Sequence, residues 1–194
     1  TDAVQAVGKI PLNLSKSAID LLTLSGHKLH APKGVGALFI RKGITFTPFV
    51  VGGHQEKNRR GGTENVPSII GLGRACELAK KYMSEEQILV KQLRDKVEDE
   101  ILEKAPDVRV NGHKTKRLPN TTNLSFEFVE GEAILLLLNE RGICASSGSA
   151  CTSGSLEPSH VLRAMGVPFT AVHGSVRLSL SRYNTIEEVD YIVE

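Results

Sequence analysis

The sequence contains no tryptophan, and six Phe and three Tyr are its only aromatic residues among 194. Proteins that bind single-stranded nucleic acids stack the bases on aromatic side chains, and this chain offers few of them. Net charge is also scarce, because 24 Lys and Arg against 22 Asp and Glu leave a formal charge of +2. No basic stripe with interleaved aromatics is present. The composition therefore argues against a nucleic-acid or polyanion binder.

Cysteine is scarce too, since Cys76, Cys144 and Cys151 are an odd number and form no C-x-x-C pair. A disulfide framework or a structural metal site is therefore not expected. Free thiols are typical of a reducing compartment, which predicts a cytoplasmic protein. The longest apolar run, residues 134–138, is too short to span a bilayer, and no signal or transit peptide is visible.

The two ends of the chain predict that it is a piece of a longer protein. It opens at Thr1 without an initiator Met and stops at Glu194. That end comes soon after a helix start, which Thr185 and Glu188 predict as a capping box.

Apolar runs and glycines predict an α/β organisation. Residues 20–25 and 35–40 are short apolar runs bounded by glycine, which are typical of buried strands of the parallel type. Residues 67–105 predict connecting helices, because Pro67 suits a first helical position and a second capping box begins at Ser84. Pro106 ends that segment.

The remainder of the chain alternates between strand and helix patterns and predicts a small α+β domain. Strands are expected at 108–111, 123–128, 143–145 and 175–181, and helices at 132–141 and 158–165. The expected domains are 1–66, 67–105 and 106–194, the middle one being the helical connector.

One candidate for chemistry is Ser25-Gly26-His27-Lys28, which follows an apolar strand. A lysine that forms a Schiff base must reach a carbonyl group and lose its proton near neutral pH, and a rigid strand end favours both. Ser25 and His27 offer a hydroxyl and an imidazole to a nearby phosphate. Spacing alone also fits a solvated loop lysine.

A second candidate is the Ser- and Gly-rich segment around Cys151. A thiol that accepts sulfur and hands it on must be exposed, mobile and partly thiolate, and small neighbours favour such a loop. Cys144 lies in an expected strand and Cys76 on an expected helix. Both are expected to be buried as small hydrophobic residues.

These motifs resemble those of the NifS/IscS-type cysteine desulfurases, which are class V aminotransferase-like enzymes of group I. The match includes residues 2–5, 25–28, 59–67, 144–158 and 173–179, in the family's order and over nearly the whole chain. The resemblance implies the carboxy-terminal half of a fold-type I pyridoxal-phosphate transferase. It also implies a partial large domain (1–66) with a mostly parallel sheet, and a truncated small domain (106–194) that carries the cysteine loop.

The resemblance assigns the cofactor-binding residues. Lys28 is implied to be the Schiff-base lysine that holds pyridoxal 5'-phosphate and moves protons on substrate carbons. Ser25 and His27 are implied to bind the cofactor phosphate. Asp2 is implied to sit beside the pyridine nitrogen, which it keeps protonated, and Gln5 to bond the ring's phenolic oxygen.

It assigns three further roles. Thr63 is implied to reach the partner's phosphate across a homodimer. Arg177 is implied to clamp the substrate carboxylate with its planar fork. Cys151 is implied to be the nucleophile that becomes a persulfide.

The implied function is conversion of L-cysteine to L-alanine, with the sulfur passed to an iron–sulfur scaffold protein. Residues 181–185 lean towards the nitrogen-fixation branch, and the fragment alone is expected to be inactive. Alternatives are a selenocysteine lyase, another class V pyridoxal-phosphate enzyme, or a non-enzymatic sulfur carrier that uses Cys151.

Overall fold

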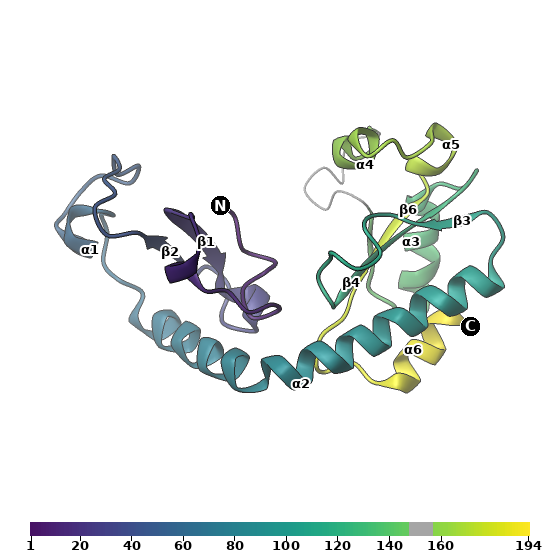
Figure 1. Cartoon of the computed structure of the whole chain (residues 1–194), viewed down its shortest axis with the longest axis horizontal. Helices are drawn as coiled ribbons and strands as arrows, with labels where there is room; N and C mark the ends of the chain where they lie inside the picture. The colour runs from purple at the N-terminus through teal and green to yellow at the C-terminus, as the bar shows by residue number, and fades with distance from the viewer. Residues whose placement is uncertain (148–156) are drawn as a thin grey trace. The chain divides into compact units, whose positions relative to one another are not determined.

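The computed structural model describes residues 1–147 and 157–194. It divides into two compact units, Thr1–Ser84 and Glu85–Glu194. The boundary falls inside the long helix α2 (Val66–Lys104), which Figure 1 shows in blue to teal.

The first unit contains a two-stranded sheet, β1 (Leu21–Ser25) and β2 (Gly36–Ile40). These strands run antiparallel, so the parallel pairing predicted for them is wrong. They are also less buried than predicted, because Leu22 is their only buried residue. Only residues 26–35 join the strands, whereas a parallel connection needs a crossover of about a dozen residues or more. The only parallel contact of the described sheet residues is an isolated bridge between Asp2 and Thr23.

The other elements of the first unit are short. The 3-10 turns η1 (Leu14–Lys16) and η2 (Gly26–Leu29) flank β1, and α1 (Gln55–Asn58) lies between β2 and α2. In α1, Glu56 and Lys57 have φ of 49° and 57°, so α1 is a left-handed turn and not a regular helix. A small core joins η2 to the start of α2 through Leu29, Leu72 and Ala75.

Helix α2 is continuous, so the second helix start predicted at Ser84 is wrong. A capping box requires a non-helical residue at its first position, and Ser84 lies well inside the helix. Residues 74–104 contain no glycine or proline to interrupt the helix. Asn65 marks the true start, since its side-chain Oδ1 accepts the Ser68 amide at 3.3 Å.

The second unit contains an antiparallel sheet with the strand order β3-β4-β6-β5. Its strands are β3 (Val108–Val110), β4 (Thr121–Phe126), β5 (Ser146–Ser147) and β6 (Ser175–Ser179). The strands predicted at 108–111, 123–128 and 175–181 are confirmed with small shifts of their ends. The strand predicted at 143–145 is wrong, because the pairing with β6 begins at Ser146.

Besides the end of α2, the described part of this unit contains four shorter helices. They are α3 (Gly131–Glu140), α4 (His160–Ala164), α5 (Phe169–Val172) and α6 (Ile186–Val193). The core joins α2, β6 and α6 through Leu93, Val97, Val176, Leu178, Leu180 and Val189, with α3 packed against it. Figure 1 shows α6 beside the end of α2. The capping box of Thr185 and Glu188 is confirmed at the start of α6. Among the described residues, no helix has the length and apolarity needed to cross a membrane.

An ionic network links α2 to the segment before β4. Arg94, only 4% exposed, donates to the Leu118 carbonyl at 3.0 Å and to the Asp95 carboxylate, which also pairs with Lys91. Partial burial raises the pKa of Asp95, but the hydrogen bonds from Lys91 and Arg94 outweigh it and leave that pKa below its ordinary value.

This lowered pKa predicts a pH-dependent contribution to stability. The Asp95→Asn variant should lose at most about 1 kcal/mol of unfolding free energy at pH 7, because the carboxylate is partly exposed. Since the folded-state pKa is depressed, that contribution is complete above the ordinary Asp value and disappears as the pH falls through the folded value. Urea unfolding at pH 7 and at acid pH tests this, with Asp99→Asn on the same helix as the control. A deficit that persists unchanged in acid would contradict the ionic explanation.

Candidate active site

Lys28 lies in η2, the turn that directly follows β1. The turn is held at both ends, since the Gly26 amide donates to the Val35 carbonyl at 2.8 Å and the Ala31 amide to the Gly26 carbonyl at 3.0 Å. Leu29, the next residue, is buried in the core against α2. Lys28 itself is half-buried. A fixed backbone of this kind restricts where its amine can reach.

Ser25 and His27 lie beside Lys28 on the same turn. The Ser25 Oγ and the His27 Nδ1 are 2.8 Å apart and form a hydrogen bond. His27 is exposed and Ser25 is half-buried. Because one of them donates to the other, the hydroxyl and the imidazole together keep at least one O–H or N–H that can donate to a phosphate oxygen.

Asp2 lies next to the same strand. Its segment pairs with Thr23 through two backbone hydrogen bonds of 3.0 Å, Ala3 N to Thr23 O and Thr23 N to Thr1 O. The Asp2 Oδ1 accepts the Val4 amide at 2.8 Å, which fixes the carboxylate. Asp2 therefore lies beside Thr23 of β1, which comes two residues before Ser25 in the sequence. Gln5 follows in an exposed turn.

Two glycines allow the strand and turn to approach closely. A Cβ at Gly26 would lie 2.9 Å from the Val35 carbonyl oxygen, and one at Gly36 would lie 2.5 Å from that of Leu24. Both contacts are with backbone, which cannot rotate away. The sequence motif contains Gly26 but does not reveal the steric role of either glycine, which becomes visible only in the structure.

The Gly36→Ala variant is therefore expected to disturb the Lys28 turn. The added methyl group would force β1 and β2 apart, and we expect cofactor affinity to fall about tenfold or more, equivalent to about 1.4 kcal/mol. Gly73→Ala is the matched control, because a Cβ there meets nothing within 4 Å. Titration of pyridoxal phosphate followed by absorbance measures both. Equal affinities for the two variants would contradict the steric argument.

Thr63 lies in the loop between α1 and α2 and is exposed. The loop is held near its base, since the Gly61 amide donates to the Val50 carbonyl at 2.8 Å and the Gly62 amide to the Gln55 Oε1 at 3.2 Å. Within the part of the chain described, no contact between Thr63 and the Lys28 turn is found.

Arg177 belongs to the second unit, where it lies in the middle of β6 and is half-buried. Its backbone pairs with Asn123 of β4 on one side and with Ser146 of β5 on the other. Among residues 1–147 and 157–194, no carboxylate forms an ion pair with its guanidinium group.

The structure describes two of the three cysteines, Cys76 and Cys144, and they differ in exposure. Cys151 lies outside the described residues. Cys144 is exposed, so the prediction that it is buried is wrong. Residues 143–145 do not form a strand, so the pairing that was expected to bury Cys144 is missing. Cys76 is half-buried against the Leu29 cluster, and this burial raises the pKa of its thiol.

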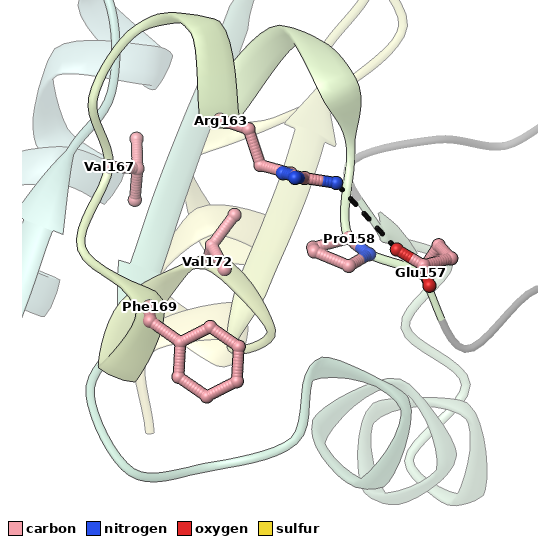
Figure 2. A pocket seen from close by; sticks show the side chains of 6 residues that line it. All are labelled: Glu157, Pro158, Arg163, Val167, Phe169 and Val172. Atoms are coloured by element: carbon pink, nitrogen blue, oxygen red, sulfur yellow. Dashed lines mark ion pairs between the residues drawn. The ribbon is translucent and has the colours of Figure 1, made fainter.

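A pocket of about 370 Å³ lies in the second unit near α4 and α5 (Figure 2). Its lining is largely apolar, and an ion pair of 3.7 Å joins Arg163 to Glu157 at one side. Of the predicted site residues that the structure describes, none lines it. The described ranges also hold no group of three or more His, Cys, Asp or Glu side chains that could bind a metal ion.

Comparison with known proteins identifies the family. The model of the class-V aminotransferases matches residues 1–192. The chain belongs to the class-V aminotransferase family. Among curated members of this family, cysteine desulfurase NifS of Azotobacter vinelandii is 62% identical over 193 residues. A cysteine desulfurase of Trichormus azollae is also 62% identical over 193 residues. Each alignment covers 100% of this chain and 48% of the relative.

Solved structures of class-V aminotransferases agree with the fold. A NifS-like protein from Rickettsia africae superposes with a TM-score of 0.90 at 37% identity, covering 99% of this chain and 50% of that one. A second NifS-like protein gives 0.89 at 40% identity, with coverage of 99% and 49%. The resemblance to this family and its pyridoxal-phosphate fold is therefore confirmed. The chain spans about half the length of the relatives it matches.

Proposed function

We propose that this chain carries the cofactor lysine, the substrate-binding arginine and the sulfur-accepting cysteine of a cysteine desulfurase. Curated relatives that are named cysteine desulfurase match the whole chain, and one of them is 64% identical to it. The observation that carries the proposal is the fixed turn after β1, which places Lys28 beside the Ser25–His27 pair.

Pyridoxal 5'-phosphate is the cofactor of this family, and the residues of the first unit fit it chemically. Lys28 offers an amine to its aldehyde, Ser25 and His27 offer donors to its phosphate, and Asp2 offers a carboxylate to its ring nitrogen. Gly26 leaves the backbone of the turn free of a side chain. When bound, the cofactor supplies an electron sink that weakens bonds to the substrate's alpha carbon.

The protein side chains divide the remaining work. Arg177 binds and orients the substrate carboxylate, and Lys28 Nζ moves a proton at the substrate carbons. The Cys151 thiolate attacks the sulfur of L-cysteine, so that a C–S bond breaks and an S–S bond forms. The substrate carbon takes a proton, and L-alanine leaves. Atoms balance, because cysteine and the enzyme thiol become alanine and an enzyme persulfide.

Partners and location are further parts of the proposal. Thr63 reaches the phosphate of a second copy in a homodimer, and an iron–sulfur scaffold protein accepts the persulfide sulfur. The NifS relative at 62% identity favours a nitrogen-fixation pathway. A cytoplasmic location fits the free thiols.

The test uses a protein of the relatives' full length, made by joining residues 1–194 to the part of the Azotobacter vinelandii relative that they do not match. We expect a yellow protein that forms one alanine per sulfide from L-cysteine in the presence of a reductant. Parallel assays with L-selenocysteine measure substrate preference. A colourless protein that carries sulfur without forming alanine would contradict the proposal and identify a carrier.

A further inference from the structure

Arg177 lies in a row of four polar residues that crosses the sheet of the second unit. The register pairs Arg177 with Asn123 of β4 and with Ser146 of β5. Asn111, which follows β3, continues the row, because its amide donates to the Asn123 carbonyl at 2.8 Å. Directly paired residues of an antiparallel sheet point to the same face. The side chains of the row therefore lie side by side on one face.

That face is polar, whereas the opposite face is packed with the apolar core. Along β6, Val176 and Leu178 belong to the core, while Arg177 alternates with them and points away. The described polar face consists of Arg109, Asn111, Thr121, Asn123, Ser125, Ser146, Ser175, Arg177 and Ser179. None of these residues carries a carboxylate, so the face offers Arg177 no anion of its own.

The row also fixes the orientation of the Asn123 amide. The Asn111 Nδ2 donates to the Asn123 Oδ1 at 2.6 Å and to the Ser125 Oγ at 2.7 Å. Asn111 is only 8% exposed, so its side chain has little freedom to turn. With its oxygen occupied by Asn111, Asn123 directs its Nδ2 donors elsewhere. Its neighbour on the other side, Arg177, carries donors only. Two adjacent donor groups therefore favour a shared acceptor, such as a carboxylate.

We propose that Asn123 is a second binding residue for the substrate carboxylate, which it shares with Arg177. The inference rests on the proposed function and extends it. Asn111 is the positioning residue that holds the Asn123 amide so that Nδ2 points to the anion. Hydrogen bonds to a charged acceptor are stronger than those between neutral groups. A bidentate arginine flanked by a fixed amide would select a carboxylate over a neutral group.

The Asn123→Leu variant of the full-length protein tests this inference. It removes the donor without adding charge, and we expect the dissociation constant of L-alanine to rise about tenfold to a hundredfold. The KM for cysteine should rise by a similar factor while kcat changes little, because the lost contact is a binding contact. Thr121→Val, on the same strand and face, is the matched control and should bind alanine normally. Cofactor absorbance serves as the check on folding.

Asn123→Asp keeps the test decisive if the leucine variant does not fold. The carboxylate introduced by this substitution would still accept from Asn111 but offers no donor, so alanine binding should weaken at least as much. Unchanged alanine affinity in a folded Asn123 variant would overturn the inference. The Arg177→Ala variant distinguishes failure of this inference from failure of the proposed function. If Arg177→Ala loses alanine affinity and the Asn123 variants do not, only this inference fails. If Arg177→Ala also binds alanine normally, the proposed carboxylate site itself is wrong.

Discussion

Replacement of Lys28 by alanine is expected to abolish cysteine turnover in the full-length protein, with a loss of at least about a thousandfold. In the proposed function the amine provides both the covalent attachment of the cofactor and a proton carrier at the substrate, and general acid–base catalysis alone contributes roughly 10²–10⁴-fold. The visible absorbance of the covalently held cofactor should disappear as well. Activity assays and absorption spectra measure the two losses independently.

The control for this variant is Lys42→Ala, an exposed lysine just beyond β2 in the same unit. It removes an equal charge at a position with no proposed role, and it should leave both readouts unchanged. Full activity in the Lys28 variant, or an equal loss in the Lys42 variant, would contradict the assignment of Lys28.

The Cys151→Ala variant should separate cofactor chemistry from sulfur transfer. We expect it to bind pyridoxal phosphate and show the same absorbance as the unsubstituted protein, because its thiol is not a cofactor ligand in the proposal. Sulfur transfer should fall to background, because the variant lacks the thiolate that accepts the sulfur in the proposal. Mass spectrometry of the protein after incubation with cysteine should show an added sulfur only when Cys151 is present.

Cys144→Ala is the appropriate comparison, because Cys144 is the exposed cysteine of the described residues. An exposed thiol is a potential sulfur acceptor, so Cys144 has to be tested beside Cys151. We expect the Cys144 variant to retain the persulfide and the activity. Sulfide release that continues undiminished in the Cys151 variant would refute the nucleophile assignment.

The sequence predicts local features of the fold well and long-range features poorly. The Thr185 capping box at α6 is confirmed because its hydrogen bonds join residues three apart. The same pattern at Ser84 is wrong, since strong helix formers on both sides carry α2 through it. The direction in which β2 returns along β1 depends on the connection between the strands, and the alternation of apolar residues carries no information about it.

The candidate site shows the same contrast. Ser25, His27 and Lys28 are adjacent in sequence, so a single turn brings them together and the motif predicts them as a group. The row of Asn111, Asn123, Arg177 and Ser146 comes from four separate strand segments, and only the register unites it. A weak signal was present, because polar and apolar residues alternate through residues 123–126 and through Ser175–Ser179. That alternation shows a polar face but not which residues are opposite one another.

The most direct test of the account is to identify the lysine that holds the cofactor. The full-length protein is loaded with pyridoxal phosphate, reduced with borohydride, digested and examined by mass spectrometry. We predict one stable adduct, on the peptide that contains Lys28. An adduct on another lysine, or none in a protein that turns over cysteine, would contradict the central claim.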